Sequence, residues 1–455
     1  MSPVAAFSRI FGSHDGLNLV RVVSAIVTAL NVSLLAWLVR HRGRVAMLIA
    51  GVGFAVLPVA GFVSTGLRLE PYCICFILVG SLVILSNEPQ QTQLTNRRLV
   101  LGGVIFGLAA LIKLWAFFPF LALAICLVPH YRRRAFVFVG AAGSAFILIS
   151  SPFFFSAPRS FLSEVLVEQL FRKTNVVFGA ESWILRLKQM TGFSYTLIAP
   201  TSRETVISFA LLVCLVVVAF AHRREREMVD VYLLLAALFT SFGLLLAPEY
   251  FNYYSYFSAP FLLGLLAVCI GRLTPLARII VEKIGLSRDI RIVAQTATAL
   301  AAVVLVIALT LYSTTFYSLA ARFGISPTSI SPITRVIPPN SCVVYTEVAL
   351  GAFANRLETN KPKCPDVVDG SGMWMAWGFH LVPPASAFVS EWKSYFQSAQ
   401  YVVSLYQLTG PNGVYSYRLV TIIPWNRALI VWFANHYRLI FEKHGLFIYL
   451  HNHSS

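Results

Sequence analysis

The sequence predicts a polytopic α-helical membrane protein that carries a small α/β domain at its C-terminal end. Hydrophobic residues make up 57% of the 455 residues, charged residues only 12%, and the mean hydropathy is +0.73. Apolar runs of about 17 to 22 residues, long enough to cross the hydrocarbon core of a bilayer, recur along the first two thirds of the chain. After residue 312 the pattern changes to short strand-like and amphipathic segments, which are typical of a folded extramembrane domain.

The apolar runs predict about ten membrane-spanning helices. We place them at residues 19–39, 45–65, 70–86, 99–113, 115–129, 135–152, 205–221, 229–247, 256–271 and 292–312. Basic residues collect in every second loop, and these clusters are Arg40–Arg44, Arg97–Arg98, Arg132–Arg134, Arg223–Arg226 and Arg272–Arg291. Because Lys and Arg are enriched in cytoplasmic loops, we expect all five clusters on the cytoplasmic side.

This layout predicts a multi-pass protein of the plasma (inner) membrane with two domains. Residues 1–312 form the transmembrane domain, whose long loop at 153–204 lies outside, and residues 313–455 form an extracytoplasmic α/β domain. The N-terminus is expected outside as well. The formal net charge of +17 comes from basic loops that meet anionic membrane lipid, so it does not indicate binding of nucleic acid.

The segment after residue 312 reads as alternating turns, strands and helices. The stretch from "SCVVYTEV" to "VVDGSG" predicts a strand, a helix and a second strand, and "SAQYVVSLY" predicts a further strand. We expect "RALIVWFANHYRLIFEKH" to be one helix and "GLFIYLH" to be the closing strand.

Cysteine positions predict one disulfide. Five of the seven cysteines lie inside predicted spans, where they act as small apolar side chains. Cys342 and Cys364 are the two cysteines of the extracytoplasmic segment, and a pair of cysteines in an oxidising compartment is a disulfide candidate. The alternative is two free thiols.

Charged residues at the outer ends of spans are candidates for function, because charge is costly near the hydrocarbon core. Glu70 starts a span with Pro71 in its first turn, and Arg68 and Lys113 stand at other outer helix ends. A carboxylate at Glu70 could hold a divalent cation or a sugar hydroxyl, Arg68 could bind phosphate in a bidentate manner, and Lys113 could bind a lipid-linked phosphate. The alternatives are a capped helix start and two cations that reach the lipid headgroups.

Aromatic residues accompany these charges on the same predicted side. Trp115 follows Lys113, and the loop "APEYFNYYSYF" places Tyr253 and Tyr254 after Glu249. Trp115 would line the path of the isoprenoid chain. Tyrosines stack on sugars and hydrogen-bond to them, so the loop with Glu249, Tyr253 and Tyr254 could form the floor of an acceptor or donor site. An interfacial aromatic belt is the alternative.

The segments "LVRVVSAIVTALNVSLLAWLVR", "GLRLEPY", "GVIFGLAALIKLWAFFPFLALA" and "APEYFNYYSYFSAPFLLGLLA" together resemble the GT-C glycosyltransferases. The likeness is to bacterial members that use polyprenyl-phosphate sugars and are related to the protein-mannosyltransferase group. It implies a transmembrane GT-C fold and transfer of a sugar from a polyprenyl-phosphate donor to a cell-envelope acceptor.

The resemblance also implies roles for individual residues. Glu70 corresponds to the second acidic site of the family, a helper or metal site that suggests a divalent cation such as Mg²⁺ or Mn²⁺, and Lys113 corresponds to the donor-phosphate position. Tyr253 and Tyr254 stand where many relatives have a His-Tyr pair. The family's first helix and first external loop, which carries the catalytic base, are expected to precede this chain, and Asp15 is the nearby external acid.

Two other functions fit the same sequence. A non-catalytic GT-C-like subunit would bind a lipid-linked sugar without turnover, in company with a partner subunit. A lipid or solute transporter would be expected to have an internal repeat and charges at mid-membrane, whereas here the charges gather at helix ends.

Overall fold

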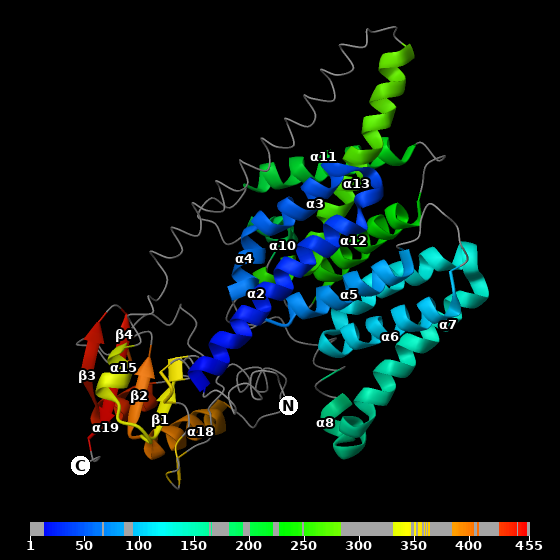
Figure 1. Ribbon diagram of the computed structural model, residues 1–455. Helices are drawn as coiled ribbons and strands as arrows, with labels where there is room; N and C mark the ends of the chain where they lie inside the picture. The colour runs from blue at the N-terminus through cyan, green and yellow to red at the C-terminus, as the bar shows by residue number, and fades with distance from the viewer. Residues whose placement is uncertain are drawn as a thin grey trace. The chain divides into compact units, whose positions relative to one another are not determined.

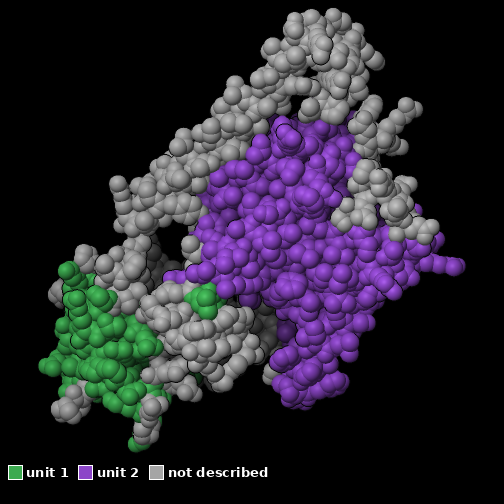
Figure 2. Space-filling view, viewed as in Figure 1, with its two compact units in different colours: residues 1–20, 171–180, 319–455 green, residues 21–170, 181–318 purple. Residues whose placement is uncertain are grey.

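The computed structural model describes residues 13–65, 68–85, 94–162, 182–193, 201–221, 227–247, 250–283, 331–346, 385–404, 427–443 and 445–452, with short pieces at 165, 350–351, 354–356, 359, 361, 363–364 and 407–408 (Figure 1). The chain divides into two compact units, which Figure 2 distinguishes by colour. Unit 1 comprises residues 1–20, 171–180 and 319–455, and unit 2 comprises residues 21–170 and 181–318. The predicted domain boundary at residue 312 lies outside the described residues.

Unit 2 is helical. Its longer helices are α2 (Ser13–Leu38), α3 (Arg44–Val56), α4 (Pro58–Thr65), α5 (Glu70–Leu85), α6 (Asn96–Ile112), α7 (Phe117–Ser156), α11 (Ser202–Ala221), α12 (Met228–Leu246) and α13 (Ser255–Lys283). Shorter pieces connect them: η1 (Arg40–Arg42), η2 (Leu114–Ala116), α8 (Pro158–Leu162), α10 (Trp183–Lys188), the π-helical turn η4 (Gln189–Phe193) and η6 (Asn252–Tyr254).

The helices confirm a multi-pass membrane protein. Among the described residues, five helices are long and apolar enough to cross a membrane, and α3 with α4 would make a sixth as one broken span. Large apolar side chains on their outer faces are exposed, including Phe136, Leu148, Phe155 and Leu211. Such side chains would be unfavourable in water but are the expected surface toward lipid.

Three predicted spans have a different shape from the expectation. The run at 45–65 is broken at Leu57, which is extended before Pro58, and α3 and α4 meet at 58°. The runs at 115–129 and 135–152 are the two arms of α7, which bends at Tyr131 (φ −143°, ψ 45°). The predicted span at 292–312 lies outside the described residues.

Helices α6 and α7 pack with their backbones in close approach. A Cβ atom on Gly103 would lie 2.5 Å from the carbonyl oxygen of Phe138, and one on Gly107 would lie 2.5 Å from that of Ala142. The two glycines form a Gly-x-x-x-Gly pattern, which allows membrane helices to approach more closely than larger residues would. This packing fixes the end of α6, where Lys113 follows.

Unit 1 contains a four-stranded sheet with the strand order β1-β2-β4-β3. Its elements are α15 (Ser331–Val336), β1 (Val343–Tyr345), α18 (Ala385–Ser398), β2 (Tyr401–Ser404), α19 (Arg427–His436), β3 (Tyr437–Lys443) and β4 (Leu446–His451). Strands β1 and β2 are parallel, and β4 pairs antiparallel with both β2 and β3. Trp392, Phe396 and Phe433 from the helices form a buried core with Val402 and Tyr449 from the sheet.

The small sheet confirms the predicted α/β character but corrects one element. The stretch expected as a single helix from Arg427 ends at His436, and its second half is strand β3. The change from helix to strand could not be recognised in the sequence, because "ALIVWF" and "YRLIF" both carry apolar residues at helical and at strand spacing. Residues 437–443 form a strand because they pair with β4, for example Arg438 with Leu450 and Leu439 with Tyr449.

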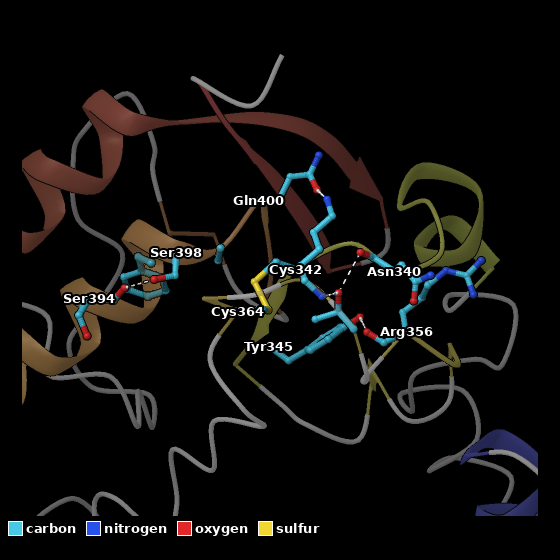
Figure 3. Close-up of a disulfide and its surroundings, with 12 residues drawn as sticks. Asn340, Cys342, Tyr345, Arg356, Cys364, Ser394, Ser398 and Gln400 are labelled. Carbon is cyan, nitrogen blue, oxygen red and sulfur yellow. Dashed lines mark hydrogen bonds between the residues drawn. A yellow bond between two sulfur atoms is a disulfide. The ribbon is translucent and has the colours of Figure 1, made fainter.

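The predicted cysteine pair is bonded in the structure. Cys342 and Cys364 form a disulfide with their Cα atoms 5.6 Å apart (Figure 3). Cys342 precedes β1, and its carbonyl oxygen accepts hydrogen bonds from the backbone N–H groups of Gln400 and Tyr401. The bond therefore attaches the segment around residue 364 to the β1–β2 edge of the sheet.

Candidate functional site

The structure brings Glu70 and Lys113 into direct contact. Glu70 is the first residue of α5, where a carboxylate interacts favourably with the helix dipole, and its side chain is 2% exposed. Lys113 follows α6 in extended conformation, and its ammonium forms an ion pair with the Glu70 carboxylate. The Lys113 side chain is 19% exposed, so the ammonium is the more accessible partner of the pair and the carboxylate is buried.

An aromatic pair lies against the cations of this site. The Nζ atom of Lys113 is 4.2 Å from the ring centroid of Tyr254, and the guanidinium carbon of Arg68 is 4.0 Å from that of Tyr253. The two tyrosine rings meet edge to face with centroids 5.0 Å apart. The ring centroids of Trp115 and Tyr254 are 5.7 Å apart. Arg68, Trp115, Tyr253 and Tyr254 therefore form one cluster with Glu70 and Lys113, and all six were predicted as site residues. Glu249, also predicted, lies outside the described residues.

Arg186 is a further cation that sequence analysis did not single out. It lies in α10 and is 8% exposed, and its Nη1 donates hydrogen bonds to the carbonyl oxygens of Leu245 (2.9 Å) and Ala247 at the end of α12. Its neighbours Leu187 and Met190 pack in the same apolar cluster as Trp115, Tyr250 and Tyr254.

The guanidinium of Arg186 is only partly satisfied. Its Nε is buried without a hydrogen-bond partner, and no carboxylate of the described residues pairs with it. The Nε and Nη2 side of a guanidinium is the fork that binds carboxylate or phosphate in a bidentate manner. The sequence signal was a single Arg in a short amphipathic segment, "SWILRLKQM", whose buried face could not be identified without the fold.

The charges of the cluster favour an anion. In the part of the chain that the structure describes, Arg68 and Lys113 contribute two positive charges to this cluster and Glu70 contributes one negative charge. Arg186 adds a positive charge on α10, and its neighbours Leu187 and Met190 pack with Trp115 and Tyr254. The negative faces of the Tyr253 and Tyr254 rings attract the first two of these cations and hold them at the site. The arrangement can bind a phosphate between the aromatic pair and the ends of α5 and α6.

The described residues of this site offer few ligands to a divalent cation. Glu70 is the described carboxylate here, and its charge is matched by Lys113. The described residues contain no group of three or more His, Cys, Asp and Glu side chains that could hold a metal ion. A cation at Glu70 would have to share the carboxylate with Lys113 and take its other ligands from substrate phosphate and water.

A second charged cluster joins the loops that the sequence places on the cytoplasmic side. Asp230, fully buried in the first turn of α12, accepts hydrogen bonds from Arg42, from Arg272 (2.7 Å) and from Nε2 of His41 (3.2 Å). Arg272 also donates to the carbonyl oxygen of Ala219 at the end of α11. The cluster therefore joins η1, α11, α12 and α13, and the pairing of Asp230 with Arg42, Arg272 and His41 indicates a structural role.

Comparison with known proteins supports the fold. The sequence matches no protein-family model and no curated protein sequence. The structure is similar to the crystal structure of ArnT from Cupriavidus metallidurans bound to undecaprenyl phosphate, with a TM-score of 0.58 and 13% identity over 99% of this chain and 87% of that chain. The apo structure of the same ArnT gives a TM-score of 0.60 and 13% identity over 98% and 86% of the two chains. At this level of identity the likeness shows the fold: the protein described here has the polytopic membrane fold of ArnT, which agrees with the GT-C fold that the sequence resemblance predicted.

Proposed function

We propose that the protein is a membrane-embedded glycosyltransferase that takes a sugar from a polyprenyl-phosphate donor and transfers it to a cell-envelope acceptor on the outer face of the plasma membrane. The observation that carries this proposal is the Lys113 ammonium held between the Glu70 carboxylate and the Tyr254 ring, with Arg68 on the adjoining tyrosine. The fold is shared with ArnT, whose crystal structure contains undecaprenyl phosphate.

The cations of the site would stabilise the phosphate as it leaves the sugar. When the bond between the sugar and the phosphate breaks, negative charge grows on the phosphate oxygens. Lys113 and Arg68 would stabilise this charge, and the free edge of Arg186 would bind the phosphate in the bidentate manner typical of guanidinium groups. Glu70 would hold the Lys113 ammonium in position before the donor arrives and would release it toward the phosphate.

The aromatic residues would form the walls of the site. Tyr253, Tyr254 and Trp115 offer stacking faces to a sugar ring, and the tyrosine hydroxyls offer hydrogen bonds. The divalent cation suggested by the sequence, Mg²⁺ or Mn²⁺, would bind at Glu70 only together with the donor phosphate. Transfer should then fall after treatment with EDTA and recover on addition of either ion, whereas a mechanism that relies on Lys113 alone should be insensitive to EDTA.

The first experiment tests recognition of the phosphate. The purified full-length chain in lipid nanodiscs would be titrated with undecaprenyl phosphate and with the neutral alcohol undecaprenol, and binding would be followed by native mass spectrometry. We expect binding of the phosphate at least tenfold tighter than that of the alcohol, because one charge-assisted contact is worth about 1.5 to 3 kcal/mol. Lys113→Ala should remove most of this preference.

Lys443→Ala is the matched control, because Lys443 is exposed on β3. Equal binding of phosphate and alcohol by the unaltered chain, or equal losses in the two variants, would overturn the proposal. Strong phosphate preference without sugar transfer from a pool of polyprenyl-phosphate sugars would instead support a non-catalytic GT-C-like subunit.

A further inference from the structure

A row of buried polar side chains runs along one face of α2. Ser24 and Asn31 are fully buried and Thr28 nearly so, although they lie in a span that is otherwise strongly apolar. Their spacing of four and three residues places them on the same side of the helix. The Ser24 hydroxyl lies 2.9 Å from the Tyr72 hydroxyl, so this face of α2 meets the first turns of α5.

Asn31 joins two segments that carry the candidate site. Its Nδ2 donates one hydrogen bond to the carbonyl oxygen of Pro71 (2.8 Å) and a second to the hydroxyl of Tyr256 (3.1 Å). Pro71 follows Glu70 in α5, and Tyr256 stands two residues after Tyr254 at the start of α13. One amide group therefore connects the segment that carries the carboxylate to the segment that carries the aromatic ring.

We infer that Asn31 is a positioning residue, which sets the distance between Glu70 and Tyr254 and thereby the place of the Lys113 ammonium between them. This inference rests on the proposed function. Lys113 contacts both partners, so a shift of either segment would move the ammonium relative to the donor phosphate. A misplacement of about 1 Å at a reacting centre can lower a rate about 100-fold.

The energetics of the Asn31 amide favour a geometric role over a stabilising one. Hydrogen bonds between membrane helices contribute little net stability on average. Asn31 is fully buried, and its Oδ1 has no hydrogen-bond partner among the described residues. An unsatisfied buried acceptor carries a desolvation cost that offsets the gain from the two donated bonds, so the amide adds little or nothing to the net stability of the fold.

The same helix α5 contains a matched control. Ser81 donates a hydrogen bond to the hydroxyl of Tyr232 in α12 (2.7 Å), and both residues are fully buried. This bond also joins α5 to a neighbour through a tyrosine hydroxyl. Ser81 lies eleven residues after Glu70 in the same helix, roughly 16 Å along its axis, and therefore far from the candidate site.

The test compares Asn31→Leu and Tyr256→Phe with Ser81→Ala and Tyr232→Phe, all in the full-length chain in nanodiscs. Hydrogen–deuterium exchange should become faster at 69–76 and at 252–258 in the first two variants and stay unchanged there in the controls. In the transfer assay we expect kcat to fall at least tenfold in Asn31→Leu while KM for the lipid donor changes less than about threefold. The double variant Asn31→Leu/Tyr256→Phe should be no worse than Asn31→Leu, because the two changes remove one shared contact.

Three outcomes would overturn the inference: unchanged exchange at both segments, equal loss of kcat in the control variants, or additive effects in the double variant. Tyr256→Phe removes the hydrogen bond from Asn31 to Tyr256 and keeps the one from Asn31 to Pro71. If Asn31→Leu fails to insert into the membrane, the exchange measurement on Tyr256→Phe still decides the test. The exchange measurement needs no activity. A chain that binds undecaprenyl phosphate no more tightly than undecaprenol would therefore refute the proposed function, whereas the exchange pattern would still decide whether Asn31 fixes the two segments.

Discussion

The Nζ atom of Lys113 lies 4.2 Å from the centre of the Tyr254 ring while it is paired with the carboxylate of Glu70. The ammonium thus contacts the start of α5 and the end of η6, and Lys113 itself follows α6. Three segments that are far apart in the sequence meet at one cation. A change in any of these segments should therefore shift the Lys113 ammonium at the candidate site.

Removal of Lys113 should destabilise the protein through Glu70. Lys113→Met leaves the buried carboxylate without its counterion, and breaking a buried ion pair in this way costs about 3 to 5 kcal/mol. The partial exposure of Lys113 places the expected loss at the lower end, about 3 kcal/mol. Thermal unfolding in nanodiscs should show a lower midpoint for Lys113→Met and recovery in Lys113→Met/Glu70→Gln. Equal midpoints for the single and double variants would contradict this account.

Alanine at Gly107 should push α6 away from α7. The added Cβ would lie 2.5 Å from the carbonyl oxygen of Ala142, so the backbones must separate. Gly143 on α7 has nothing within 4 Å of the same position, and Gly143→Ala is the matched control. We expect a lower thermal midpoint for Gly107→Ala alone, with a loss of about 1 to 3 kcal/mol as for other overpacked cores. A similar midpoint for the two variants would show that α6 and α7 are not in close contact.

Neutralisation of Asp230 should destabilise the second charged cluster. Asp230→Asn removes the carboxylate that Arg42, Arg272 and His41 share, at a site with no solvent exposure. The expected loss is about 3 kcal/mol, measured as a lower unfolding midpoint or as a smaller folded fraction after detergent extraction. Glu442→Gln makes the same charge change on the exposed face of β3 and should leave the midpoint unaltered.

Loss of the disulfide should destabilise unit 1. Cys342→Ser/Cys364→Ser opens a loop of 22 residues, and a disulfide around a loop of this size contributes about 3 kcal/mol. We expect a lower unfolding midpoint for the double variant and the same lowering for the unaltered chain in dithiothreitol. Gel mobility that does not change on reduction would argue that the bond is absent from the purified protein.

The predicted orientation in the membrane can be tested by cysteine labelling. Arg133→Cys should react with a membrane-impermeant maleimide only after spheroplasts are opened, because basic loops face the cytoplasm. Ser394→Cys, exposed on α18, should react in intact spheroplasts. The reverse pattern would invert the topology and place the Glu70 site on the cytoplasmic side.

Much of the candidate site could be predicted because charge stands out against an apolar background. Glu70 and Lys113 are charged residues at the ends of spans, where their cost in lipid makes them conspicuous. Their contact with each other could not be derived, since hydropathy carries no information on which helices are neighbours. The tyrosine pair was conspicuous by composition, but its position on Lys113 and Arg68 depends on the fold.

The residues that sequence analysis missed share a physical reason. Asn31 barely changes the hydropathy of a long apolar run, and Asp230 stands beside a basic loop, where it reads as a solvated charge. Arg186 became notable only when its guanidinium proved to be buried at the end of α12. For the break at Leu57 the signal was present, because the residue before a proline avoids helical conformation.

The close approach of α6 and α7 restricts how a lipid can reach the site. Backbone atoms face each other at Gly103 and Gly107, which leaves no width for a hydrocarbon chain between the two helices. The ring of Phe106 in α6 continues the contact by meeting Phe138 of α7 edge to face, and Phe138 stacks on Phe120 in the same helix α7. This side of the bundle is thus closed, and a prenyl chain whose headgroup reached Lys113 would have no path between α6 and α7.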